Sequence, residues 1–135
     1  MKKPIYLDYN ATTPLDPLVL EAMLPYLKEE FGNASSSSHA YGWEAAKAVK
    51  KARQQVADAI GASPEEIIFT SGATESNNMA ILGLSLQFSK QKPMHIITSN
   101  VEHKAVMDVC LQAKEWGAEV SFLPVDEYGQ ISLEQ

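Results

Sequence analysis

Alternating strand and helix patterns are readable in residues 66–125, EIIFTSGATESNNMAILGLSLQFSKQKPMHIITSNVEHKAVMDVCLQAKEWGAEVSFLPV. Short β-branched runs predict strands at Glu66–Thr70, His95–Thr98 and Glu119–Val125. The segment Thr74–Phe88 predicts a helix that is apolar on most sides and is therefore expected to be buried. With a further helix before the last strand, this order predicts parallel strands joined by right-handed crossovers, which is an α/β layered fold.

The helix before the last strand has a predicted start, an apolar face and a predicted end. Ser99 and Glu102 have the spacing of a capping box, and Gly117 is expected to end the helix. The face expected to pack inward carries Val106, Val109, Cys110 and Ala113. Because Cys110 lies on this face, we interpret it as an inert core thiol and not as a nucleophile.

Two helices behind an extended arm are predicted in the residues before Glu66. Ile5–Asp8 is a short strand or an extended arm, and Asp16-Pro17 begins a helix that should end at Gly32-Asn33. A second helix is predicted over Trp43–Ile60 and closes at Gly61. The residues expected to face inward are Leu20, Met23, Leu24, Leu27 and Phe31 in the first helix and Val49, Ala52, Val56 and Ile60 in the second.

Two domains are expected. Residues 1–40 form an amino-terminal arm, helix and polar loop, and residues 41–135 form the first part of a larger α/β domain. Ser132–Gln135 has the pattern of a capping box without the helix that it should open, so we expect the chain to be truncated at Gln135.

Charge and composition argue against several classes of function. Hydrophobic residues make up 45% of the chain, which is normal for a globular protein. The formal net charge of −6 argues against nucleic-acid binding through a basic patch. No run of roughly 18 apolar residues is present, so no membrane span is expected, and the start of the chain does not have the pattern of a secretory signal. The single cysteine excludes an internal disulfide and indicates a reducing compartment, for which we expect the cytoplasm.

The first candidate site is the turn Thr70-Ser71-Gly72-Ala73-Thr74, at the carboxyl end of a predicted strand. Gly72 and Ala73 leave the backbone uncovered, Thr74 offers a hydroxyl, and the helix start offers unpaired N–H groups. These features suit a phosphate. The alternative is a plain turn with helix caps, because small residues at a strand–helix turn are common in both cases.

The second candidate is His103, which is predicted to lie in the first turn of its helix. The helix dipole disfavours a positive charge there, so a neutral imidazole is expected at about pH 7, free to stack on a flat ring or exchange a proton. The alternative is a surface histidine near a helix start. Both candidates lie at adjacent strand ends, which strengthens each of them.

The remaining titratable residues have simpler interpretations. His39 is expected to be exposed in a polar loop, His95 to be structural, and Lys104 to lie on a solvated helix face. Three scattered histidines and one cysteine give no metal-ligand spacing, so no metal site is expected.

Three segments resemble motifs of cysteine desulfurases of the NifS/IscS type, which belong to the class V aminotransferases. Leu7–Pro14 (LDYNATTP) resembles their amino-terminal arm, Phe69–Asn78 (FTSGATESNN) their cofactor-phosphate motif, and Glu102–Val106 (EHKAV) the segment with their ring-stacking histidine. The resemblance covers the whole chain. One departure is Asn33-Ala34-Ser35, where the family commonly has Pro after Asn, and this should loosen a loop near the site.

The resemblance implies a fold, a reaction and a set of site residues. The fold would be that of pyridoxal-phosphate-dependent transferases, aspartate aminotransferase-like (fold type I), with helices on both faces of a mixed sheet that is incomplete here. The reaction would remove sulfur from L-cysteine to give L-alanine and an enzyme persulfide for iron–sulfur clusters and thio-cofactors. Site residues carried over are Ala73 and Thr74 at the cofactor phosphate, His103 on the pyridine ring and in proton transfers, and Asn10, Ala11, Thr12 and Thr13 in an arm at the substrate entrance.

The same resemblance implies partners and missing parts. Family members are homodimers that pass sulfur to acceptor or scaffold proteins of iron–sulfur assembly. Their Schiff-base lysine and catalytic cysteine lie in segments that have no counterpart in this chain, so the 135 residues alone are expected to be inactive. Alternatives are a related lyase acting on selenocysteine or cysteine sulfinate, and a non-catalytic phosphate-binding α/β module.

Overall fold

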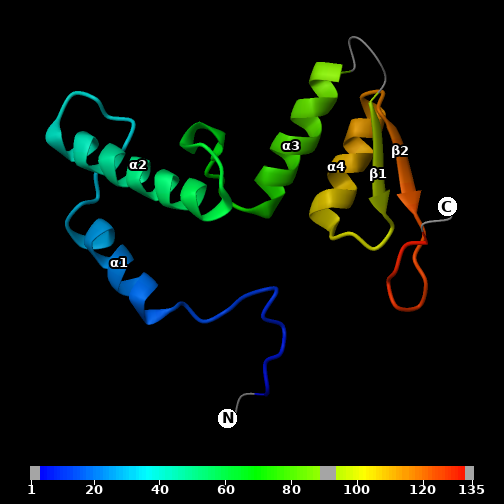
Figure 1. Cartoon of the computed structure of the whole chain (residues 1–135), viewed down its shortest axis with the longest axis horizontal. Coiled ribbons are helices and arrows are strands. Elements are labelled where there is room, and N and C mark those ends of the chain that lie inside the picture. Colours follow the sequence, from blue (N-terminus) through cyan, green and yellow to red (C-terminus); the bar gives the residue numbers. More distant parts are fainter. Residues whose placement is uncertain (1–3, 89–93, 133–135) are drawn as a thin grey trace. The chain divides into compact units, whose positions relative to one another are not determined.

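The structure, a computed structural model, describes residues 4–88 and 94–132, which fall into two compact units, Met1–Ile68 and Phe69–Gln135 (Figure 1). Each unit is described by itself. The predicted capping box at Ser132–Gln135 falls largely outside the described residues. None of the helices in the described ranges is both long enough and apolar enough to cross a membrane.

The first unit contains two helices and a short 3-10 turn: α1 (Pro17–Lys28), α2 (Ala40–Ile60) and η1 (Pro64–Glu66). Asp16 caps α1 as predicted, because its Oδ1 accepts the amide of Leu18 at 2.8 Å. Gly61 ends α2 as predicted, in the left-handed conformation with φ of 69°.

Helix α1 ends at Lys28, earlier than the predicted end at Gly32-Asn33. The amides of Glu29 and Glu30 both bond to the carbonyl of Pro25, at 2.8 and 2.9 Å, so the regular ladder stops there. Phe31, predicted on the helix face, instead stacks on Tyr41 with ring centroids 5.9 Å apart.

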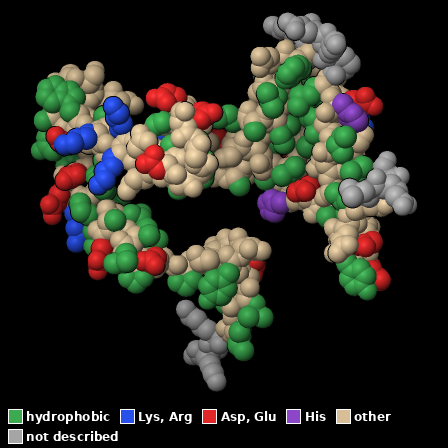
Figure 2. All heavy atoms as spheres, in the orientation of Figure 1, with side chains coloured by type: hydrophobic (Ala, Val, Ile, Leu, Met, Phe, Trp, Pro, Cys, Tyr) green, Lys and Arg blue, Asp and Glu red, His purple; other side chains and the backbone are tan. Residues whose placement is uncertain are grey.

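The predicted inward faces of α1 and α2 are largely exposed in this unit. No residue of α1 is buried, and α2 buries Gly42, Ala45 and Ala57, whereas Val56 and Ile60 are exposed. The expectation was wrong because α2 packs mainly on the short η1 turn, which is too small to cover its apolar side chains. Figure 2 shows apolar side chains on the surface of both units.

The predicted strand at Glu66–Thr70 is not formed. Its first residue ends η1, where the Glu66 carboxylate accepts the Ser63 amide at 2.7 Å in a capping box. The residues that follow are irregular, and the carbonyl of Ile67 accepts a hydrogen bond from the Arg53 guanidinium instead of pairing with a strand. The local helix-start signal, Ser followed by Pro and two glutamates, therefore outweighed the β-branched run.

The second unit has the order α3 (Ala73–Phe88), β1 (His95–Ser99), α4 (Lys104–Glu115) and β2 (Glu119–Leu123). Strands β1 and β2 pair in parallel with His95 opposite Glu119, which confirms the predicted β-α-β order over this part of the chain. Helix α4 packs on β2 and on α3.

The core of the second unit lies under α4. Val109, Cys110 and Ala113 are buried on one face, as predicted, and Cys110 is 0% exposed. Helix α3 was predicted to be buried, and this prediction was wrong. Ser85 is its one buried residue among those described, and Leu86 is 57% exposed, because within this unit α3 packs mainly on α4.

Helix α4 does not begin at the predicted capping box. The strand pairing continues past β1, where the Asn100 amide bonds to the Leu123 carbonyl at 2.9 Å. The Ser99 hydroxyl donates to the Glu102 carboxylate at 3.2 Å and not to a helix amide. The helix therefore begins one turn later, at Lys104, with His103 as its N-cap.

Candidate functional site

The start of α3 offers backbone N–H groups that the helix itself does not use. Ser76 is the first residue whose amide bonds back into the helix, to the Gly72 carbonyl at 3.1 Å. The amides of Ala73 and Thr74 have no carbonyl one turn earlier to bond to. A Cβ built on Gly72 would meet no atom within 4 Å, so the turn before the helix is open.

Polar side chains around this turn are mostly paired with one another. One carboxylate oxygen of Glu75 accepts both the amide and the hydroxyl of Ser71 at 2.6 Å each, and these bonds hold the pKa of Glu75 below its usual range. The Thr70 hydroxyl lies 2.7 Å from the Ser76 hydroxyl. Within the described ranges the Thr74 hydroxyl has no such partner, so it remains free for a ligand together with the amides.

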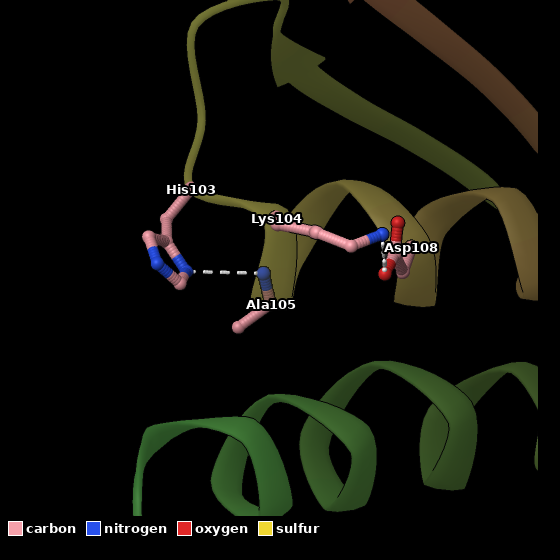
Figure 3. A network of polar contacts seen from close by, with 4 residues as sticks. All are labelled: His103, Lys104, Ala105 and Asp108. Carbon is pink, nitrogen blue, oxygen red and sulfur yellow. Dashed lines mark hydrogen bonds and ion pairs between the residues drawn. The ribbon is translucent and has the colours of Figure 1, made fainter.

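His103 is held by the helix that it caps. Its Nδ1 accepts the amide of Ala105 at 3.1 Å, as Figure 3 shows. The prediction placed His103 in the first turn of the helix, and the structure places it one residue earlier, at the N-cap. Lys104 extends along α4 to Asp108, with Nζ and Oδ2 2.6 Å apart, and its side chain is 81% exposed, as predicted for a solvated helix face.

The structure brings the two predicted cofactor segments to one end of the second unit. Helices α3 and α4 pack together, and in Figure 1 they run in the same direction, so their amino-terminal ends lie at the same end. Ala73 and Thr74 start α3, and His103 precedes α4. Helix dipoles thus place partial positive charge at this end, where it favours an anion.

The arm that carries Asn10, Ala11, Thr12 and Thr13 belongs to the first unit. It is an exposed turn, in which the Asp8 carbonyl accepts the Ala11 amide at 3.1 Å. The Tyr6 hydroxyl lies 2.9 Å from that of Thr12. These contacts order the arm locally.

A cavity of about 610 Å³ between α1 and α2 contains none of the predicted site residues. Its lining is mostly apolar or small, with Phe31, Ala45 and Val49 among it, and it also includes Lys51 and Gln55. We retain the start of α3 as the candidate site because backbone N–H groups, a hydroxyl and a helix amino terminus come together there. In the described ranges no group of three or more His, Cys, Asp or Glu could hold a metal ion.

Two hydrogen bonds at helix starts were not predicted. His39 is exposed, as expected, but it is also the N-cap of α2, and its Nδ1 accepts the Gly42 amide at 3.3 Å. The other is the bond between Glu75 and Ser71 at the start of α3. Both have a sequence signal, namely a polar side chain directly before a helix and a glutamate in its first turn.

The family model described as Aminotransferase class-V matches residues 5–135. The human protein named "Cysteine desulfurase" is 54% identical over 133 residues, which are 98% of this chain and 29% of that protein. The Neisseria meningitidis serogroup C protein named "Cysteine desulfurase IscS" is 55% identical over 135 residues, which are 100% of this chain and 33% of that protein.

Solved structures of related proteins are also similar to this chain. The structure named "NIFS-LIKE PROTEIN" matches with a TM-score of 0.86 and 42% identity, over 96% of this chain and 35% of the other. "SspA in complex with cysteine" matches with a TM-score of 0.77 and 43% identity, over 87% and 33%. The expected fold class is confirmed, and the chain spans about a third of the length of these proteins. The chain belongs to the aminotransferase class-V family.

Proposed function

We propose that the complete protein is a pyridoxal-phosphate-dependent cysteine desulfurase, which converts L-cysteine to L-alanine and leaves the sulfur on an enzyme thiol as a persulfide. The observation that carries this proposal is the placement of Ala73, Thr74 and His103 at one end of a unit that overlaps with cysteine-desulfurase-like structures. One of these structures is that of SspA in complex with cysteine, which supports cysteine as the substrate here.

The residues at the start of α3 fit a cofactor phosphate. The amides of Ala73 and Thr74 and the Thr74 hydroxyl can donate to phosphate oxygens, and the helix dipole adds to the attraction. Ser71 does not compete, because Glu75 already accepts both of its donors. Pyridoxal phosphate, when bound, supplies an electron sink for breaking bonds in an amino-acid substrate.

His103 would then lie beside the cofactor ring. The cap of α4 orients its imidazole, so the ring can stack and can exchange a proton with the substrate. The arm of Asn10, Ala11, Thr12 and Thr13 would lie at the substrate entrance. Its turn is ordered before substrate binds, because Asp8 and Tyr6 hold it.

The remaining parts of the machinery are proposed to lie outside this chain. Cys110 does not serve as the reactive thiol, because it is buried in the core under α4 and its pKa is raised, first by burial and second by the nearby charge of Glu102. The Schiff-base lysine and the sulfur-accepting cysteine would come from the part of the protein that this chain does not span. Homodimerisation, sulfur transfer to acceptor or scaffold proteins of iron–sulfur assembly, and a cytoplasmic location complete the proposal.

A completed enzyme tests this function. Residues 1–135 replace the matching segment of the Neisseria meningitidis relative, to which this chain is 55% identical. We expect cysteine-dependent release of alanine, because the relative's segment supplies the lysine and the cysteine while this chain supplies the phosphate site and His103. Failure to bind pyridoxal phosphate would contradict the proposal.

Two variants of Thr74 test the phosphate site in the completed enzyme. Thr74→Val removes the hydroxyl and keeps the shape, so the Kd for pyridoxal phosphate should rise about tenfold, which corresponds to one hydrogen bond to a charged group. Thr74→Ser keeps the hydroxyl and should restore most of the affinity. Equal affinities of the two variants would show that the hydroxyl does not contact the phosphate.

A further inference from the structure

The two ring nitrogens of His103 have different environments in the structure. Nδ1 accepts the Ala105 amide at 3.1 Å, and Nε2 is on the opposite side of the ring (Figure 3). An imidazole nitrogen can accept a hydrogen bond only when it carries no proton. The bond therefore requires Nδ1 to be unprotonated, which leaves the single proton of the neutral ring on Nε2.

The alternative ring orientation is unfavourable. A rotation of the ring by half a turn would place the Cδ2 hydrogen against the Ala105 amide, which would leave that helix-start amide without an acceptor. A proton on Nδ1 would also place two N–H groups face to face.

The segment before His103 is fixed at its other end. Ser99 is buried, and its hydroxyl donates to Glu102, while the Asn100 amide bonds to the carbonyl of Leu123 in β2. Lys104 is tied to Asp108 along the helix, so its ammonium group points away from the ring. The imidazole is thus positioned from both sides, by the end of β1 and by the start of α4.

We propose that Nδ1 of His103 has a purely positioning role, as the acceptor that caps α4, and that the proton exchanged with substrate or cofactor is the one on Nε2. The second half rests on the proposed function, whereas the first half concerns this chain alone. The cap then does two things at once: it holds the ring plane, and it sets which nitrogen carries the transferable proton.

Two substitutions separate these roles. Asn is a good N-cap residue, and its Oδ1 occupies the position of Nδ1, so His103→Asn should keep the cap and lose the Nε2 proton. Gln is a poor N-cap residue, but its Nε2 reaches the position of the histidine Nε2, so His103→Gln should lose the cap and keep a donor there. His103→Ala removes both and serves as the baseline.

The tautomer can be measured in the completed enzyme. In a sample labelled with ¹⁵N-histidine, the pair of ring-nitrogen signals that disappears in His103→Asn belongs to His103. We expect the singly protonated ring of His103 to show an unprotonated Nδ1 and a protonated Nε2. A protonated Nδ1 with an unprotonated Nε2 would overturn the proposal.

The completed enzyme gives a second, independent readout. Hydrogen exchange over the first turn of α4 should be unchanged in His103→Asn and about fivefold faster in His103→Gln, the usual effect of a lost N-cap. The kcat should fall by roughly 10²–10⁴-fold in both variants, because an amide donates a hydrogen bond but cannot transfer a proton. A kcat of His103→Asn close to that of the unchanged enzyme would refute the role of Nε2, and faster exchange of α4 in His103→Asn would refute the capping equivalence with Nδ1.

Failure of this inference and failure of the proposed function give different results. If the completed enzyme with His103 intact binds no cofactor and releases no alanine, the proposed function is wrong. The ¹⁵N spectrum and the exchange of α4 still decide the role of Nδ1 in that case. If the enzyme is active and His103→Asn keeps its kcat, the Nε2 assignment alone is wrong.

Discussion

Substitutions of Cys110 separate its contribution to packing from any chemistry of its thiol. The Cys110 side chain is 0% exposed and lies on the buried face of α4, so Cys110→Ala removes one buried heavy atom. Ile→Val, which also removes one buried heavy atom, costs about 0.5–1.5 kcal/mol, so we expect a loss of about 1 kcal/mol in the stability of α4.

Cys110→Ser keeps the shape and adds a polar group. A buried hydroxyl without a partner costs about 1–3 kcal/mol. The serine can bond to the carbonyl of Val106 one turn earlier, which brings the expected cost to the lower end of that range. We therefore expect Cys110→Ser to be no more stable than Cys110→Ala.

The assay for both variants is hydrogen exchange of α4 in the completed enzyme, together with kcat/KM for L-cysteine. Exchange should accelerate about fivefold for a loss of about 1 kcal/mol, and kcat/KM should stay within about twofold. The reasoning is refuted if kcat/KM falls by about 100-fold while α4 exchange is unchanged, because Cys110 would then act in the chemistry.

The other predictions concern the thiol, the caps and the isolated chain. The folded state raises the pKa of Cys110. The contribution of the protonated thiol to the stability of the fold is therefore full below the ordinary thiol pKa of about 8.5 and is lost as the pH rises above it. A thiol reagent at about pH 8 should label the folded chain far more slowly than the urea-unfolded chain. The folded state lowers the pKa of Glu75. The contribution of the Glu75 carboxylate to the stability of the fold is therefore present above the ordinary pKa of about 4.3 and is lost as the pH falls through the lowered pKa. A ¹³C carboxyl titration should show the lowered pKa, and Ser71→Ala should raise it. His39→Ala should destabilise the start of α2 by about 1 kcal/mol, measured by hydrogen exchange, whereas His39→Asn should not. The isolated 135 residues should melt broadly and give no borohydride-trapped cofactor adduct; a sharp cooperative melt of the pure monomer would contradict the first expectation, and specific trapping on Lys104 the second.

Local signals predicted the parts of the fold that depend on local physics. Asp16 before a proline predicted the start of α1, Gly61 the end of α2, and the apolar face of α4 the burial of Cys110. Parallel pairing of β1 with β2 also followed from the order of elements. The caps and the buried face depend on residues close together in sequence, and the strand pairing depends on the single connection from β1 through α4 to β2.

The errors arose where a segment needs partners far along the chain. The run from Glu66 to Thr70 has strand composition, but within the described residues no strand pairs with it, and the capping box at Ser63 took its first residue. The apolar sides of α3 and α2 were expected to be buried, and the elements that pack on each helix within its own unit do not cover them. Periodicity predicts which face of a helix is apolar, but it does not reveal what covers that face.

The elements around the candidate site were predictable in part. A helix that starts after Thr70–Thr74 and a histidine near the start of α4 were expected and are present, whereas the site residues themselves remain a prediction. The capping bond of His103 was missed, because Ser99 and Glu102 have the spacing of a capping box and concealed the later helix start. The sequence alone does not decide at which of these two positions the helix begins, because the choice depends on the pairing of Asn100 with β2.

A crystal structure of the completed enzyme with pyridoxal phosphate tests the shared site most directly. We expect the phosphate to accept hydrogen bonds from the amides of Ala73 and Thr74, and the imidazole of His103 to lie over the pyridine ring with Nδ1 still on the Ala105 amide. A cofactor whose phosphate is bound elsewhere, or a ring that His103 does not touch, would contradict the assignment.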